Sequence, residues 1–211
     1  MSRKLVPEDL QSNSGFELLA EVSHQNLREF VMEQIKKERY IIRVYSAYQV
    51  IMLFLLVFFI TRSIVFSLKG HPGTLLSVGY AILFSFTILI VFHELLHAMA
   101  YLLIGARKIS FGVILKKFVF YALADRQVIA PRAFHIVALA PLLAVKLICL
   151  VVIVSTCNNQ VFYFFMTVMC LHSLFCAGDM AMLAFYNLHR GKEIYNFDDR
   201  SEGKTYFYIR K

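Results

Sequence analysis

The chain has 211 residues, of which 59% are hydrophobic and 17% are charged, and its mean hydropathy is +0.63. This composition excludes an ordinary soluble domain, because such domains carry about 25% charged residues. The formal charge of +8 does not indicate nucleic-acid binding, since the basic residues are divided among three segments that flank apolar runs. We therefore expect an integral membrane protein embedded in the lipid bilayer.

The N-terminal segment, residues 1–46, is predicted to be cytoplasmic, amphipathic and helical. Residues 1–13 are polar and predict no regular structure. "SGFE" at 14–17 has the Ser-x-x-Glu pattern of a capping box and predicts a helix that begins near Gly15. From Leu27 onward, apolar residues recur at helical spacing opposite a charged face. This helix is expected either on the membrane surface or packed on the protein itself.

Four apolar runs approach or exceed the roughly 20 residues that a helix needs to cross a bilayer. They lie at about 47–67, 80–104, 133–154 and 161–188. Most basic residues fall before the first run, between the second and third, and after the fourth. Because positive charge collects on the cytoplasmic side, both termini are predicted to be cytoplasmic. The expected domains are an N-terminal segment at 1–46, a transmembrane domain at 47–188 and a cytoplasmic tail at 189–211.

The connection between the second and third spans predicts β-structure. "KISFGVILKKFVFYALADRQVI" at 108–129 is rich in β-branched and aromatic residues, and "KK" divides it into two runs of strand length. "KTYFYIRK" at the C-terminus predicts a further short strand. The expected fold is an all-α membrane protein of four transmembrane helices with a short cytoplasmic β-hairpin. The four cysteines form no C-x-x-C pair and are given no role.

"HELLH" at 93–97 lies inside the second apolar run, where an ionisable residue indicates function. On a helix, His93 and His97 lie on one face about 6 Å apart along the axis. This spacing allows both imidazoles to bind one Zn²⁺, with Glu94 placed as the general base. The alternative is a coincidence of two core histidines and a paired glutamate.

A catalytic zinc site needs a third protein ligand. The spans contain two acidic residues, Glu94 and Asp179, and each lies roughly 14 Å below the cytoplasmic surface, about nine residues from its helix end. Asp179 is therefore the predicted third ligand. His172 is predicted to lie about two turns deeper, toward the outer leaflet, where it cannot easily reach the same ion. The alternative for Asp179 is an ion pair with Lys146, the deep cation of the third span.

These residues resemble a known family. "HELLH" in a membrane helix, a strand-like cytoplasmic segment, the Pro-containing "ALAPLL" and an Asp on the following helix are similar to the site-2 protease group of intramembrane metalloproteases, and especially to small bacterial membrane proteins described as "putative zincin peptidases". The resemblance covers roughly residues 75–190. It implies that His93, His97 and Asp179 bind zinc, that Glu94 is the general base, and that the chain lies in the bacterial cytoplasmic membrane. "LHSLFCAG" before Asp179 lacks the Asn-Pro that is usual in site-2 proteases.

The leading hypothesis is a zinc metalloprotease that hydrolyses peptide bonds of membrane protein or peptide substrates within or near the bilayer. The second is a non-catalytic zinc-binding protein that acts as a scaffold or regulator of another membrane protein. A di-iron lipid desaturase is disfavoured, because it needs several histidine clusters. Substrate selection is expected in the membrane core or in a regulatory membrane partner. The 108–123 stretch is expected either to pair with an unwound substrate as an edge strand or to anchor its loop in the interface.

Overall fold

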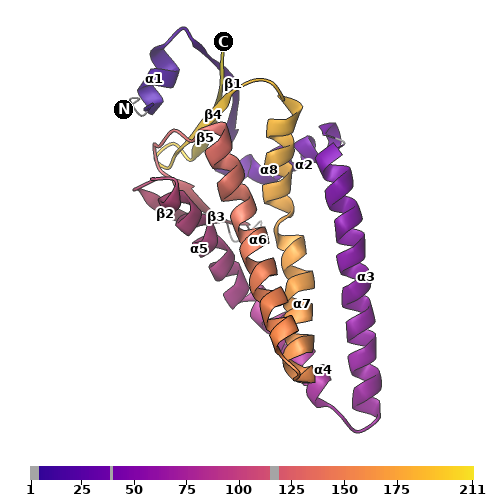
Figure 1. Ribbon diagram of the computed structural model, residues 1–211. Helices are drawn as coiled ribbons and strands as arrows, with labels where there is room; N and C mark the ends of the chain where they lie inside the picture. Colours follow the sequence, from indigo (N-terminus) through magenta and orange to yellow (C-terminus); the bar gives the residue numbers. More distant parts are fainter. Residues whose placement is uncertain (1–4, 39, 115–118) are drawn as a thin grey trace. The chain divides into compact units, whose positions relative to one another are not determined.

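The computed structural model describes residues 5–38, 40–114 and 119–211, and most of them are helical (Figure 1). The elements, in chain order, are α1 (Pro7–Ser12), β1 (Phe16–Ser23), a 3-10 helix η1 (His24–Asn26), α2 (Leu27–Lys37), α3 (Tyr40–Leu68), α4 (Gly73–Phe86), α5 (Ile88–Leu103), β2 (Ile109–Ile114), β3 (Val119–Ala124), α6 (Pro131–Ser155), α7 (Asn159–Phe175), α8 (Ala177–Leu188), β4 (Ile194–Asp199) and β5 (Lys204–Arg210).

The chain divides into two compact units. Unit 1 comprises Met1–Ile42, Glu94–Leu139 and Gly178–Lys211, and unit 2 comprises Arg43–His93 and Ala140–Ala177. The boundaries therefore fall within α3, α5 and α6 and at the start of α8. Unit 1 contains all the strands, whereas unit 2 is helical.

Two of the described helices, α3 and α6, are long and apolar enough to cross a membrane, and up to four spans result if each of two bent helix pairs is one span. The bent pairs are α4 with α5 and α7 with α8. The single helices that the sequence predicts over 80–104 and 161–188 are therefore broken, at Thr87 and at Cys176. The prediction of helices apolar enough for a membrane protein is confirmed, and four is the upper limit of the possible spans.

The expectation of an all-α fold is too simple, because unit 1 contains a three-stranded antiparallel sheet of order β1-β5-β4 (Figure 1). The predicted C-terminal strand is confirmed as β5, which lies in the centre of this sheet. One face of the sheet buries Phe197 and Tyr208 against Leu10 of α1. The sequence reading did not include β4, because the apolar alternation of Ile194–Asp199 is short and ends in two carboxylates.

The prediction of a helix near Gly15 is wrong. Phe16–Ser23 forms β1, which pairs antiparallel with β5 from Phe16↔Arg210 to Ser23↔Lys204. The capping-box pattern is a local signal, and here the hydrogen bonds of the non-local strand pairing outweigh it. Part of the polar segment at 1–13 is also structured, because Pro7 starts α1 and the Asp9 carboxylate accepts the Val6 N–H at 3.0 Å.

The predicted helix that begins at Leu27 is confirmed as α2, and it packs on the protein itself. The ring of Phe30 lies 5.2 Å from that of Phe185 in α8 and 6.0 Å from that of Phe207 in β5. After α2, the buried carboxylate of Glu38 accepts hydrogen bonds from the Ile42 N–H at 3.1 Å and from the Asn187 side chain at 2.8 Å. Glu38 therefore caps the first turn of α3 and links it to α8.

The predicted β-hairpin is confirmed as the antiparallel pair β2–β3, with Ile109 opposite Ala124. Lys116 and Lys117, which divide the two runs in the sequence, lie outside the described residues. Gly112 faces Tyr121 across the hairpin, and a Cβ at this glycine would lie 2.2 Å from Cζ of that ring. The tyrosine ring can therefore cover the strand only because position 112 has no side chain.

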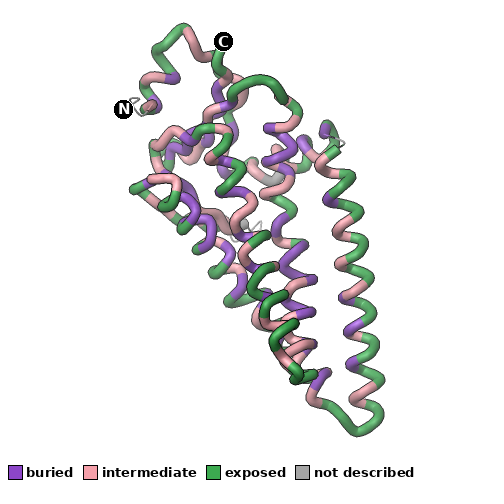
Figure 2. Tube along the Cα trace, viewed as in Figure 1, coloured by how far each residue is buried: buried purple, intermediate pink, exposed green. Residues whose placement is uncertain are grey.

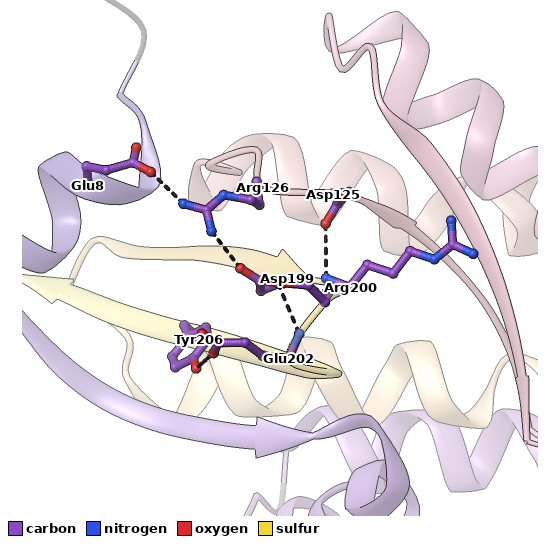
Figure 3. A network of polar contacts seen from close by, with 8 residues as sticks. Glu8, Asp125, Arg126, Asp199, Arg200, Glu202 and Tyr206 are labelled. Carbon is purple, nitrogen blue, oxygen red and sulfur yellow. Dashed lines mark hydrogen bonds and ion pairs between the residues drawn. The ribbon is translucent and has the colours of Figure 1, made fainter.

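Arg126, just after β3, links three parts of unit 1 (Figure 3). Its guanidinium donates hydrogen bonds to Asp199 of β4 at 2.8 Å and to Glu8 of α1 at 2.5 Å. The Asp199 carboxylate also accepts the Ser201 hydroxyl and the N–H groups of Ser201 and Glu202. The Ser201 hydroxyl lowers the pKa of Asp199 most, with further lowering from these N–H groups and Arg126, and together they outweigh the effect of burial. The network fixes the hairpin against the three-stranded sheet.

Unit 2 has a separate apolar core. Helices α4 and α7 lie side by side (Figure 1), and Val78 packs with Tyr163, Met166 and Phe59 of α3. Only 11% of the residues in the most apolar window of α3 are buried, and Figure 2 shows exposed and half-buried residues along most of its length. In water this surface would be unfavourable, at about 25 cal/mol per Å² of apolar area. A lipid environment removes that cost, as expected for a membrane protein.

Candidate metal centre

The HELLH sequence lies in α5 between a bend and a glycine stop. At Thr87 the chain leaves the helical conformation, the hydroxyl donates a hydrogen bond to the Leu83 carbonyl at 2.7 Å, and α4 and α5 meet at a bend of 48°. Gly105, with φ of +84°, ends the helix in the left-handed conformation that favours glycine. Between these points α5 is a continuous helix, so His93 and His97 lie one turn apart on the same face, as predicted.

His97 is buried, and both of its ring nitrogens face acceptors. Nδ1 lies 3.0 Å from the backbone carbonyl oxygen of Val137 in α6, and Nε2 lies 3.2 Å from Oδ1 of Asp179. A neutral imidazole has one N–H and can donate to only one acceptor. A second proton or a metal ion must therefore lie between Nε2 and the carboxylate. If Nδ1–H donates to the carbonyl, the Nε2 lone pair points at the site, which is the usual arrangement of a metal-binding histidine.

Asp179 reaches this position because of the break at Cys176. The residue after α7 has φ of −76° and ψ of 4°, which is not helical, and α8 restarts at Ala177. Asp179 therefore lies in the first turn of α8, where a negative charge is favourable next to the helix N-terminus. Its side chain is 20% exposed, compared with 11% for that of His97. The predicted pairing of Asp179 with the HELLH helix is consistent with this contact in unit 1.

Glu94 and His93 occupy adjacent positions of α5 on either side of the unit boundary. Glu94 is half-buried and lies three residues before His97, so the two side chains are neighbours on the helix surface. His93 is 6% exposed, and its Nδ1 lies 3.1 Å from Nε2 of His172 in α7, within unit 2. The structure thus pairs His97 with Asp179 in one unit and His93 with His172 in the other.

Lys146, the alternative partner of Asp179, has its own contacts in unit 2. Its ammonium donates a hydrogen bond to the Met169 carbonyl and lies 5.4 Å from the centre of the Tyr48 ring. These contacts stabilise the buried ammonium group, so an ion pair with a carboxylate is not required for Lys146 to lie in an apolar helix. Asp179 instead makes its charged contact with His97.

A comparison with protein families matches residues 86–193 to the family described as "Putative zincin peptidase". The match spans 108 of the 211 residues (193 − 86 + 1), just over half of the chain, and includes α5 with HELLH and the Asp of α8. The chain belongs to this family. No curated protein and no solved structure matches it in the corresponding comparisons.

A zincin peptidase is expected to hold zinc, and the residues of α5 and α8 fit that ion. Imidazole nitrogen and carboxylate oxygen are common zinc ligands, with metal–ligand distances of about 2.0–2.2 Å. Two such ligands on a tetrahedral ion lie about 3.4 Å apart, and Nε2 of His97 lies 3.2 Å from Oδ1 of Asp179. The hydrogen bond between Nδ1 of His97 and a backbone carbonyl supplies the outer-shell contact that orients such a ligand.

The sequence reading missed His172 and Cys176. His172 was considered only as a further ligand of the HELLH ion, and the structure places its Nε2 3.1 Å from Nδ1 of His93. Cys176 lies 3.7 Å from Nδ1 of His172, and both are fully buried. Their four-residue spacing in the sequence is the signal that could have identified them as a pair.

Proposed function

We propose that this zincin peptidase family member is a membrane-embedded zinc metallopeptidase of the site-2 protease type. The observation that carries the proposal is the placement of His97, whose two nitrogens face the Val137 carbonyl and the Asp179 carboxylate. A buried imidazole between two acceptors needs a second proton or a metal ion, and HELLH is the sequence pattern in which such a histidine binds zinc. Family membership supports the same chemistry.

The proposed ligands are His93, His97 and Asp179. His93 lies one helical turn before His97 on a continuous helix, which is the spacing that lets two imidazoles share one ion. Three protein ligands leave one position of a tetrahedral ion for water or substrate. Zinc held there would polarise the scissile carbonyl and lower the pKa of a water molecule, as in other zinc hydrolases.

Glu94 is the proposed general base. A carboxylate next to the first histidine and three residues before the second can reach a water at the site. It would accept the proton of the attacking water and then pass that proton to the leaving amine. Because Glu94 is half-buried in an apolar helix, few water molecules compete for its carboxylate. Asp179, in contrast, is proposed to act as a ligand and to hold His97 in one orientation.

The proposed location is the cytoplasmic membrane, with four spans and both termini in the cytoplasm. α3 and α6 would each cross alone, and the pairs α4–α5 and α7–α8 would each cross as a bent span. In this arrangement HELLH and Asp179 lie after the bends, toward the basic connections that favour the cytoplasmic side. A reporter fused to the C-terminus is expected to be cytoplasmic, and a periplasmic reporter would contradict this topology.

The proposed substrate is a membrane protein or peptide whose cleavable segment is unwound. A peptide bond inside a helix is shielded by its own hydrogen bonds, and an unwound backbone in lipid needs new partners. The hairpin could supply them, because β2 pairs on one side with β3 and no second strand pairs with it among the described residues. The alternative is that the hairpin anchors its loop in the interface. Proline substitutions along the unpaired edge of β2 would reduce cleavage without changing zinc content only in the first case.

A non-catalytic zinc protein is the competing function, since regulators can keep a metal site without using it. Metal analysis of purified wild type and His93→Ala tests the site itself, with loss of at least one zinc per chain expected in the variant. His135→Ala is the matched control, because His135 is exposed and its Nδ1 contacts the Pro131 carbonyl of its own helix. Equal zinc content in wild type and His93→Ala would contradict the proposed site.

A further inference from the structure

Unit 2 is unusual in its metal-binding side chains. The ranges 43–93 and 140–177 contain no Asp or Glu, so the side chains there that commonly bind metals are histidines and cysteines. Imidazole and thiolate are the ligands that Zn²⁺ and Cu⁺ prefer, whereas Mg²⁺, Ca²⁺ and Mn²⁺ prefer carboxylate and carbonyl oxygen. Any metal held by side chains of this unit is therefore expected to be a soft, thiophilic ion.

Three of these side chains converge. The donor atoms of His93, His172 and Cys176 all lie within 4.8 Å of one another. His172 lies in the last turn of α7, Cys176 directly follows that helix, and Sγ of Cys176 lies 3.7 Å from Nδ1 of His172. Cys176 and His172 are fully buried, and His93 is 6% exposed.

The spacing of the donor atoms is close to that of a zinc site. Nδ1 of His93 lies 3.1 Å from Nε2 of His172, and two nitrogens on a tetrahedral zinc lie about 3.3 Å apart. Sγ of Cys176 lies 3.9 Å from the same Nε2, compared with about 3.6 Å for a nitrogen and a sulfur on one zinc. These two distances differ from those of a zinc site by a few tenths of an ångström, and the third pair, Cys176 and His93, has its donor atoms within 4.8 Å.

We propose that His93, His172 and Cys176 form a second metal site, which binds Zn²⁺ or Cu⁺ through two imidazoles and one thiolate. Without metal, the Cys176 thiol lies 3.4 Å from the backbone carbonyl of His172, which can accept its proton in a weak hydrogen bond. Metal binding replaces that S–H contact, and the thiol proton is released to solvent. The site uses Nδ1 of His93; when Nε2 also binds the ion proposed at HELLH, the imidazole releases its ring proton and bridges the two ions as imidazolate. It does not depend on the proposed peptidase activity.

Cobalt substitution of the full-length protein in detergent tests this proposal, because a thiolate ligand gives a near-ultraviolet sulfur-to-cobalt charge-transfer band. We expect the band in wild type and in His97→Ala, and we expect its loss in Cys176→Ser and in His172→Ala. Cys170→Ser is the matched control, because Cys170 is likewise a buried cysteine. This substitution must leave the band unchanged. Absence of the band in wild type, or its persistence in Cys176→Ser, would overturn the proposal.

A second measurement needs no cysteine variant. X-ray absorption of His97→Ala loaded with Zn²⁺, and separately with Cu⁺, is expected to show a sulfur ligand, at about 2.3 Å for zinc. The sample that shows this sulfur ligand identifies which ion the site binds. If both samples show only nitrogen and oxygen ligands, the three side chains form a hydrogen-bonded cluster and not a metal site. Because His97→Ala removes a ligand of the proposed HELLH site, loss of cleavage with a retained sulfur shell separates the two proposals.

Discussion

The two units differ most in where they keep their charge. All 14 acidic residues of the chain fall in unit 1, and none falls in unit 2. Unit 1 buries carboxylates only with partners, as Asp199 does with Arg126 and the N–H groups of its turn. Unit 2 has one deeply placed charge, Lys146, whose ammonium group contacts a backbone carbonyl and an aromatic ring. Carboxylate side chains are thus confined to unit 1, whereas unit 2 is an apolar set of helices whose metal-binding side chains are histidines and cysteines.

The strongest test of this division is Glu94→Gln, in the proposed base of unit 1. The amide cannot accept a proton, so cleavage of a membrane-protein substrate is expected to fall by about 10²–10⁴-fold. Zinc content should stay at the wild-type value, because Glu94 is not a proposed ligand. Cleavage assays on reconstituted protein, beside metal analysis of the same samples, measure both. Wild-type cleavage by this variant would remove Glu94 from the mechanism.

Asp179→Asn and Lys146→Met compare one charged group from each unit. Loss of the carboxylate is expected to weaken zinc binding by more than about tenfold, because His97 then faces a neutral amide in place of an anionic ligand. Lys146→Met keeps the length of the side chain and should leave zinc affinity unchanged. Competition with a chromophoric chelator measures both constants. If Lys146→Met weakened zinc binding as much as Asp179→Asn, the ion-pair alternative for Asp179 would regain support.

Glu38→Gln tests the buried carboxylate that caps α3. Burial raises the pKa of Glu38, but the hydrogen bonds from Ile42, Asn187 and Tyr40 outweigh it and lower the pKa below its usual value. A lowered folded-state pKa means that the stabilisation is complete above the unfolded pKa of about 4.3 and is lost as the pH falls toward the folded value.

At pH 7 this variant is expected to lower the free energy of unfolding by roughly 1–3 kcal/mol, since a charged acceptor is replaced. As the pH is lowered from 5, the thermal midpoint of this variant should also fall less than that of wild type. The control is Glu33→Gln, whose partner is the exposed Lys37, and for which a change of at most about 1 kcal/mol is expected. Parallel pH profiles of wild type and Glu38→Gln would contradict the assignment.

The same substitution made once in each unit compares how the two units bury a hydroxyl group. Thr205 of unit 1 donates a hydrogen bond to Oδ1 of Asp198 at 2.5 Å, and Thr205→Val is expected to cost about 1–3 kcal/mol because it removes a donor to a buried carboxylate. Thr167 of unit 2 is also buried, but its hydroxyl has no hydrogen-bond partner among the described residues. Thr167→Val is therefore expected to be neutral or stabilising by up to about 1 kcal/mol. Chemical denaturation in mixed micelles measures both, and equal losses would show that the two units bury polar groups alike.

The sequence reading succeeded where the signal is local. The His93–His97 spacing, the helix after Leu27, the hairpin between the apolar runs and the C-terminal strand all follow from short-range periodicity, and the structure contains each of them. It failed where a local signal competes with a distant partner. The capping-box pattern at Ser14 has no effect once β5 pairs with the following residues, and β5 lies almost 190 residues away in the sequence.

The amino-acid sequence alone limits the chemistry that is available to this protein. It leaves residues 43–93 and 140–177 without Asp or Glu, gives helices apolar enough for a membrane, and spaces two histidines one turn apart beside a glutamate. Which groups come into contact depends on the folded structure: the Val137 carbonyl and Asp179 contact His97, and His172 contacts His93. The physical reason is that side-chain spacing within one helix is fixed by its 1.5 Å rise per residue. Contacts between helices depend on bends such as those at Thr87 and Cys176, which apolar periodicity does not encode.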